Sequence, residues 1–197
     1  MTDKAWLWLG FGCMAVGSIA LCLLGLNRRT RDEENHWILH FTIPILATAS
    51  YFAMATGQGI LTLADGRSMY YARYIDWALT TPLLLTGLIL TALGSPFRRW
   101  AVLLGLLLTD VFMIATGAFA AASPSGSIAK WVWYLMSCGA FAFIYVSLFG
   151  TLGREADKTG AEAARVFKSN RIILAVLWLI YPINSCSARK VSGRSIC

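Results

Sequence analysis

The stretch Arg73-Tyr74-Ile75-Asp76-Trp77-Ala78-Leu79-Thr80-Thr81-Pro82-Leu83-Leu84-Leu85 lies inside an apolar run that extends from residue 69 to 93. About 20 apolar residues cross a bilayer as a helix, so this run is long enough to span. On a helix, Arg73, Asp76 and Thr80 share one face because they are three and four residues apart. A charge in lipid costs at least about 2.5–3.5 kcal/mol, which makes this face a candidate functional site rather than a simple helix-joining ion pair.

The rest of the chain has the composition of a membrane protein. Of 197 residues, 57% are hydrophobic and 14% are charged, and eight are Trp, whereas soluble domains carry about 25% charged residues. This composition excludes a disordered chain, a coiled coil, a disulfide scaffold and a typical soluble enzyme. Residues 1–184 are predicted to form an all-α, multi-pass transmembrane helical bundle, with helices at about 5–26, 37–55, 69–93, 100–122, 131–149 and 166–184. Residues 185–197 form a polar tail.

The net charge of +7 is explained by topology rather than by nucleic-acid binding. Lys and Arg concentrate in the gaps after the first, third and fifth helices, which predicts an outside N-terminus, in a bacterial inner membrane. The gap at 56–68 carries Gly57, Gly59 and Asp65-Gly66, which favours a turn or a small hairpin. The five cysteines include no C-x-x-C motif, so neither a metal site nor a disulfide framework is predicted.

Other polar groups inside the predicted spans have two interpretations each. Asp110 shares a face with Met113 and Gly117, and a protonated carboxyl group bonded to a neighbouring helix is the favoured interpretation. His40 is either a helix–helix contact or a proton relay. Aromatic and hydroxyl side chains recur at helical spacing and either pack the bundle or together line a pocket for a flat apolar ligand. These stripes are Trp77, Thr81 and Leu84; Tyr134, Ser137 and Phe141; and Trp178 and Tyr181.

Residues 73–85 resemble the third helix of the microbial rhodopsins, the bacteriorhodopsin and proteorhodopsin superfamily. Segments 110–117, 133–138 and 171–182 resemble the fourth, fifth and sixth helices, and Tyr51 matches the tyrosine of the second. The resemblance extends to about Asn184. It implies a seven-helix bundle that holds all-trans retinal as a protonated Schiff base on a lysine of the last helix.

The same resemblance implies roles for individual residues. Asp76 would be the counterion and primary proton acceptor, Arg73 would tune the pKa of that carboxyl group and the outward path, and Thr80 would hydrogen-bond it. Leu84 occupies the colour-tuning position and implies green absorption. The residues expected to contact retinal are Trp77, Thr81, Leu84, Asp110, Met113, Gly117, Tyr134, Ser137, Phe141, Trp178, Tyr181 and Pro182.

Two features depart from the family pattern. Gly87, eleven residues after Asp76, stands where many pumps place an internal proton donor, about 16 Å further along the helix. The triplet Asp76, Thr80 and Gly87 resembles a bacterial subgroup that pumps protons without this donor, with reprotonation through water and His40. The second departure is the lack of a mid-span lysine, since the five lysines are Lys4, Lys130, Lys158, Lys168 and Lys190. The chain is therefore expected to be truncated or frameshifted before the Schiff-base lysine.

The leading functional prediction is a retinal-binding, light-driven outward proton pump, or a truncated form of one. A sensory photoreceptor and a non-photoactive membrane protein on the same scaffold remain alternatives. Chloride pumping is disfavoured by Asp76, and sodium pumping by the lack of the Asn and Gln pattern of sodium pumps. No nucleophile–base pair, metal set or phosphate loop indicates an enzyme. The expected partners are lipid, retinal and protons, and both a monomer and a homo-oligomer remain open.

Overall fold

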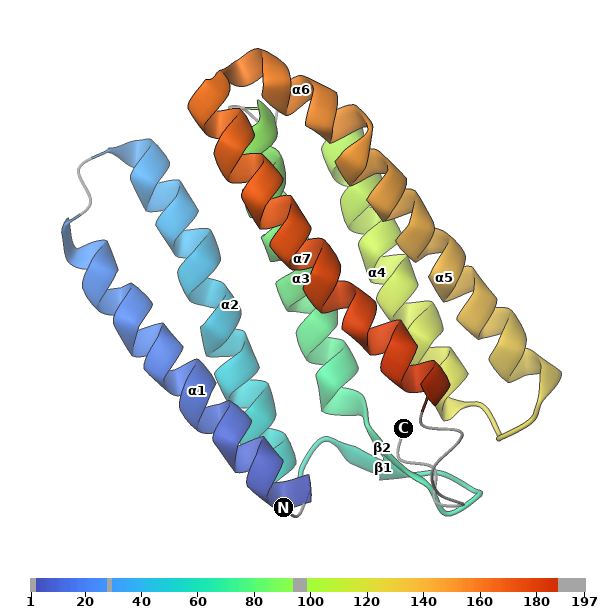
Figure 1. The fold of residues 1–197 in the computed structure, drawn as a ribbon. Helices are drawn as coiled ribbons and strands as arrows, with labels where there is room; N and C mark the ends of the chain where they lie inside the picture. Colours follow the sequence, from blue (N-terminus) through green and yellow to red (C-terminus); the bar gives the residue numbers. More distant parts are fainter. Residues whose placement is uncertain (1–2, 28–29, 94–98, 188–197) are drawn as a thin grey trace. The chain divides into compact units, whose positions relative to one another are not determined.

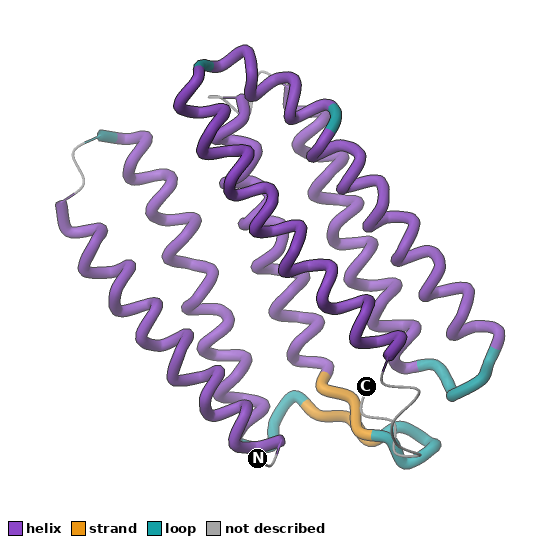
Figure 2. The backbone as a smooth tube through the Cα atoms, in the orientation of Figure 1, coloured by secondary structure: helices purple, strands orange, loops and turns teal. Residues whose placement is uncertain are grey.

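The computed structural model describes residues 3–27, 30–93 and 99–187, with the backbone alone for residues 180–187. Within these ranges the chain is all-α apart from one two-stranded sheet (Figures 1 and 2), as the sequence predicts. The helices are α1 (Asp3–Leu24), η1 (Gly25–Asn27), α2 (Arg31–Ala55), α3 (Tyr71–Leu93), α4 (Trp100–Ala122), α5 (Ile128–Phe149), α6 (Thr151–Thr159) and α7 (Ala161–Ser187). The strands are β1 (Ile60–Thr62) and β2 (Ser68–Tyr70).

Several boundaries differ from the predicted ones because local capping determines where a helix begins. Helix α2 begins at Arg31 instead of 37, since the Thr30 hydroxyl accepts a hydrogen bond from Glu33 N at 3.2 Å and the Glu33 carboxylate accepts one from Thr30 N at 3.3 Å. Helix α5 begins at Ile128 instead of 131, because Ser127 caps it by accepting from Lys130 N. Residues 69–70 belong to β2 rather than to α3.

The polar gap before the sixth predicted span is itself helical. Helix α6 occupies residues 151–159, and α7 begins at Ala161 instead of 166. Gly160 separates the two helices with φ of 141°, a conformation that L side chains rarely adopt. Helix α7 continues to Ser187, so it includes the first three residues of the predicted tail. Residues 188–197, with Lys190, lie outside the described residues.

Within the part of the chain that the structure describes, five helices are long and apolar enough to cross a membrane. They correspond to α1, α2, α3, α4 and a continuous segment that joins α5 and α6, from Ile128 to Thr159. Each of these five segments overlaps one of the first five predicted spans. Helix α7 is the sixth long helix.

The chain divides into two compact units. The first comprises Met1–Leu61 and Tyr70–Gly87. In it α1 packs against α2, and the ring of Tyr51 lies directly against Gly10. The Trp37 indole lies against Gly25 in the same way and donates a 2.6 Å hydrogen bond to the carbonyl of Leu21. Close helix approach in this unit therefore depends on small residues of α1 and η1.

The second unit comprises Thr62–Met69 and Leu88–Cys197. In it α4 and α5 run side by side (Figure 1), and α7 contacts both α5 and α6. Helix α6 joins three other segments through polar contacts. The Thr159 hydroxyl donates to the carbonyl of Ala92 at 2.7 Å, and Glu155 and Asp157 pair with Arg99 and Lys168 at 2.9 and 2.6 Å.

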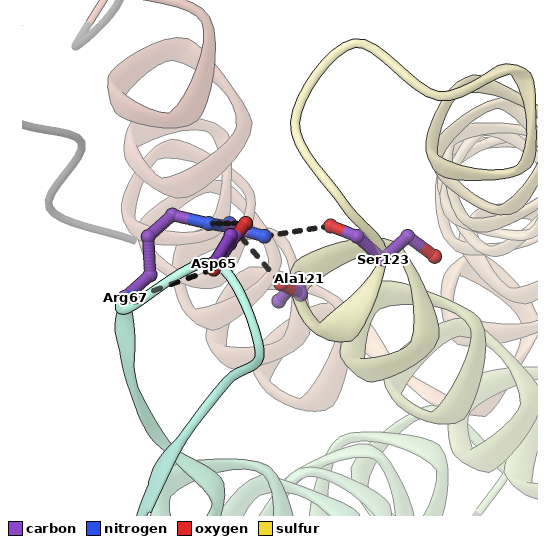
Figure 3. A network of polar contacts seen from close by, with 4 residues as sticks. All are labelled: Asp65, Arg67, Ala121 and Ser123. Atoms are coloured by element: carbon purple, nitrogen blue, oxygen red, sulfur yellow. Dashed lines mark hydrogen bonds and ion pairs between the residues drawn. The ribbon is translucent and has the colours of Figure 1, made fainter.

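The turn between β1 and β2 is tied to the end of α4 by one arginine (Figure 3). The guanidinium of Arg67 donates to the Asp65 carboxylate at 2.7 Å, to the Ser123 carbonyl at 2.7 Å and to the Ala121 carbonyl at 3.4 Å. The carbonyls at a helix C-terminus have no partner within the helix, so Arg67 acts as a cap for α4 from another element. The predicted hairpin is confirmed, and its turn is held by charge.

Candidate functional site

The polar face of α3 is buried as the sequence predicts. Asp76 is 5% exposed, Thr80 5% and Thr81 8%. The hydroxyl groups, however, bond to the main chain: Thr80 Oγ1 donates to the carbonyl of Asp76, and Thr81 Oγ1 to the carbonyl of Trp77, both at 2.8 Å. Thr80 therefore shares the face of Asp76, but its hydroxyl group does not hydrogen-bond the Asp76 carboxylate. The resemblance implies such a bond, so this expectation is not met. This back-bonding is common for Ser and Thr inside helices.

The carboxylate of Asp76 is the main electrostatic feature of this face. Its Oδ1 atom is buried and has no hydrogen-bond partner among the described residues. Among the described residues, no ion pair joins the Asp76 carboxylate to Arg73. The guanidinium carbon of Arg73 lies 5.7 Å from the ring centroid of Tyr70 instead. An ionised carboxylate out of water is costly unless a cation or a donor faces it. A cation or a hydrogen-bond donor beside Oδ1 would therefore satisfy Asp76.

A second polar position in the same unit pairs His40 of α2 with Gly87 of α3. A Cβ atom on Gly87 would lie 3.1 Å from Cε1 and 3.5 Å from Nε2 of the His40 ring. The other ring nitrogen, Nδ1, lies 2.6 Å from the carbonyl of His36. This hydrogen bond requires a proton on Nδ1, so in the neutral ring the lone pair is on Nε2. The absence of a side chain at position 87 thus leaves room for the imidazole.

In the second unit, α4 and α5 bring several of the predicted ligand contacts together. The Ser137 hydroxyl donates to the carbonyl of Met113 at 2.9 Å, and Thr116 donates to the same carbonyl at 3.1 Å. A Cβ on Gly117 would lie 3.5 Å from Ser137 Oγ. Met113 is 8% exposed and Asp110 is completely buried. Met113, Gly117 and Ser137 therefore form one contiguous group between α4 and α5.

Aromatic rings extend this group along α5 toward α7. The ring centroids of Phe141 and Trp178 are 6.5 Å apart, and those of Phe141 and Tyr145 are 4.4 Å apart. Tyr134 lies near Phe141 in sequence but contacts Trp131, with centroids 6.3 Å apart in an edge arrangement. Tyr181 and Pro182 are in α7, and their side chains lie outside the described residues.

Two residues that join α5 to α7 are missing from the predicted set. The Tyr145 hydroxyl donates to the carbonyl of Ala175, and Arg171 Nη1 donates to the carbonyl of Leu148 at 3.3 Å. The Arg171 guanidinium carbon also lies 4.4 Å from the centroid of the Phe149 ring, within cation–π range. Tyr145 follows Phe141 by one helical turn and so lies on the same face of α5. This spacing is the sequence feature from which Tyr145 could have been predicted.

Residues 1–190 match the protein family described as bacteriorhodopsin-like protein. The chain belongs to this family. It is 39% identical over 186 residues to bacteriorhodopsin from Haloterrigena sp. (strain arg-4), a match that covers 92% of the chain and 72% of the relative. The crystal structure of the thermophilic rhodopsin from Rubrobacter xylanophilus is similar with a TM-score of 0.88 and 36% identity, over 92% of this chain and 79% of that one. The crystal structure of a light-driven proton pump from Leptosphaeria maculans is similar with a TM-score of 0.86 and 33% identity. This match covers 98% of this chain and 85% of that one.

Family membership makes the chain a multi-pass membrane protein of a transport and photoreceptor family, whose members are not enzymes and bind retinal. In the first unit, Asp76 offers a buried acceptor atom that suits a cationic or proton-donating group. In the second unit, a Cβ on Gly117 would be in ordinary contact with Ser137 Oγ. The four described lysines, in contrast, lie close to helix ends: Lys4, Lys130, Lys158 and Lys168.

Proposed function

We propose that the chain is a retinal-binding, light-driven outward proton pump of the subgroup with Asp76, Thr80 and Gly87 on its third helix. The observation that carries the proposal is the buried Oδ1 atom of Asp76, which has no hydrogen-bond partner among the described residues. Light-driven proton pumps from Leptosphaeria maculans and Coccomyxa subellipsoidea, each 33% identical to this chain, support it. A proton acceptor at this position must be an ionised carboxylate, and a nearby cation favours the ionised form.

Attached to an added lysine as a protonated Schiff base, retinal would supply a light-switched change of geometry and a transferable proton. Asp76 would hold that proton at Oδ1. Thr80 keeps the backbone of Asp76 in place through its 2.8 Å hydrogen bond to the carbonyl of that residue. Arg73, one turn before Asp76, would attract the carboxylate in its ionised form and direct the released proton outward. Trp77, Thr81 and Leu84 would contact the polyene from the same helix.

The second unit would supply the remaining contacts. Ser137, held by the Met113 carbonyl, would present a fixed oxygen, and Gly117 lies beside it, where a Cβ would be 3.5 Å from Ser137 Oγ. Sites for flat apolar ligands bind mainly through apolar and aromatic side chains with few polar groups. The proposed contact residues of this unit are Asp110, Met113, Gly117, Tyr134, Ser137, Phe141, Trp178, Tyr181 and Pro182.

Reprotonation would use His40 in place of a carboxylic donor. Its Nδ1 proton is engaged by the carbonyl of His36, so Nε2 is the atom that gains and releases protons. Nε2 is also the ring nitrogen that faces position 87, at 3.5 Å from a Cβ built on Gly87. A glycine at this position therefore gives the imidazole access to the third helix. Water would connect His40 to the site.

The proposed orientation has the N-terminus outside, in the inner membrane of a bacterium. The cations in and around α6 would then lie on the inner side, in agreement with the positive-inside rule. His40, in the third turn of α2, would face the same side, where protons are taken up. The cations concerned are Arg154, Lys158, Arg165, Lys168 and Arg171.

The test supplies the attachment lysine, because the described helices carry no lysine near mid-span. Residues 185–197 are replaced by the lysine-bearing last helix of a microbial rhodopsin, and all-trans retinal is added. We expect a visible absorption band that borohydride abolishes, and acidification of the medium when cells are illuminated. Asp76→Asn should abolish the acidification, whereas Asp65→Asn, on the hairpin, should leave it unchanged.

The same experiment separates the alternatives. A band with a photocycle of seconds and no acidification would contradict pumping and favour a sensory photoreceptor. No band in the extended chain, despite correct insertion in the membrane, would favour a non-photoactive protein. The chain without the added helix is expected to form no borohydride-sensitive band.

A further inference from the structure

The two histidines of the chain are four residues apart on α2. His36 and His40 therefore point to one side of the helix, and their ring centroids lie 6.3 Å apart with planes at 32°. The first turn of α2 is polar and exposed, with Arg31, Glu33 and Glu34 accessible. Ions from the aqueous phase can therefore reach the pair.

From this arrangement we infer that His36 and His40 form a binding site for a divalent transition-metal ion, with copper(II) as the preferred ion. Imidazole nitrogen suits Cu²⁺, Zn²⁺ and Ni²⁺, and Cu²⁺ binds most strongly in this series. Two histidines at positions i and i+4 of a helix are a recurrent way to offer two nitrogens to one metal. Neither this site nor its ligand follows from the proposed pump mechanism.

The hydrogen bond at His40 prepares the ring for a metal. Its Nδ1 lies 2.6 Å from the carbonyl of His36, so the proton of the neutral ring is on Nδ1 and Nε2 carries the lone pair. Metal-binding histidines commonly donate their second nitrogen to a carbonyl or a carboxylate, which fixes the ring. The His36 ring makes no hydrogen bond to a described residue, so it can turn to present either nitrogen.

The coordination would be completed by water. In the described part of the chain, no group of three or more His, Cys, Asp or Glu side chains is arranged to hold a metal. Glu33, one turn before His36, accepts a hydrogen bond from Thr30 N as part of the helix cap. Two protein nitrogens plus water predict reversible binding rather than a permanent structural ion.

Binding is tested on the purified full chain, without retinal, by titration with Cu²⁺ and pulsed electron paramagnetic resonance. We expect one bound ion per chain with couplings from two imidazoles. His36→Asn or His40→Asn should each leave one coupling and weaken binding at least about tenfold, since each removes one of two ligands. The far-ultraviolet circular dichroism of each variant checks that α2 still folds.

A matched control keeps two histidines but changes their spacing. In His36→Asn with Ile38→His, the rings are two residues apart and do not face each other. We expect a single imidazole coupling from this variant. Cys13→Ser, on the exposed side of α1, should bind Cu²⁺ like the unmodified chain. A single coupling in the unmodified chain, or unchanged affinity in His36→Asn, would overturn the inference.

One consequence depends on the proposed function. Bound Cu²⁺ would occupy Nε2 of His40, next to Gly87, and should slow reprotonation in the extended, pigment-forming chain, with recovery after chelation. Unchanged reprotonation kinetics in a chain that binds Cu²⁺ through both imidazoles would contradict the relay role of His40. Because binding is measured without retinal, it can succeed or fail independently of pumping.

Discussion

Gly10 of α1 lies directly against the ring of Tyr51 of α2, so that a Cβ atom on Gly10 would overlap the ring. The two helices can approach this closely because position 10 has no side chain. In membranes, helix pairs depend on such close packing, since lipid is as apolar as the side chains it would replace. Tyr51 is thus positioned by an element that lies 41 positions earlier in the chain.

Gly10→Ala should destabilise the first unit by about 1–3 kcal/mol, because the added methyl group forces Tyr51 or the helix axis to move. Unfolding of the purified protein in detergent, followed by circular dichroism, gives the measurement. Gly12→Ala is the matched control, since nothing lies within 4 Å of a Cβ at that position. Equal stabilities of the two variants would contradict the prediction.

Arg67→Met should release the hairpin from the end of α4. The substitution removes hydrogen bonds from a charged donor to Ser123 and Ala121, and such bonds contribute about 1.5–3 kcal/mol. We expect a lower unfolding temperature and faster hydrogen exchange at residues 60–70. Arg154→Met, at an exposed position of α6, should change neither. A hairpin with unaltered exchange would show that Arg67 is not its anchor.

The stability of the hairpin should depend on pH through Asp65. The side-chain hydrogen bond from Arg67 holds the pKa of Asp65 below its ordinary value of 3.8, although the carboxylate is exposed. A lowered pKa in the folded state means that the contribution is complete above the ordinary pKa and is lost as the pH falls through the folded value. The stability difference between the unmodified chain and Asp65→Asn should therefore shrink below about pH 4. A difference that is constant from pH 7 to pH 2 would contradict this prediction, and high salt should reduce it throughout.

Gly87→Asp should accelerate reprotonation in the extended, pigment-forming chain. It places a proton-donating group against His40, and positioned acids and bases contribute about 10²–10⁴-fold to proton transfer. Flash photolysis measures the effect. Gly87→Asn has nearly the same shape without the acid, so it should match or slow the original rate. Equal acceleration by both variants would point to packing rather than proton donation.

The sequence predicts the helical bundle well, because a span of the bilayer requires a long apolar run and each run is visible. It predicts helix starts less well. Arg31–His36 is too polar for a hydropathy argument, and only the reciprocal hydrogen bonds of Thr30 and Glu33 extend α2 to Arg31. Helix α6 is also too short and too polar to be counted as a span of its own. It is held in place by Glu155, which pairs with Arg99 far away in sequence, and by Asp157, which pairs with Lys168 of α7.

The candidate site shows the same division. Burial of Asp76 and Thr80 follows from their shared face. Spacing places Met113 on one helix face and Ser137 on another, but it does not predict that these two residues meet. The hydrogen-bond acceptors of the hydroxyl groups cannot be predicted from the sequence, because they are main-chain carbonyls, which every residue has. Thr80 and Ser137 both donate to such carbonyls, at 2.8 and 2.9 Å. The contacts of Tyr145 and Arg171 with Ala175 and Leu148 were missed for the same reason.

These two contacts connect α7 to α5 at neighbouring levels, one through a tyrosine hydroxyl group and one through an arginine. Under mechanical load, a pull on α7 would be transmitted to α5 before either helix leaves the bilayer. Single-molecule force spectroscopy should therefore record the two helices as one extraction event with a single force peak. Removal of both side-chain links should split that peak into two smaller ones.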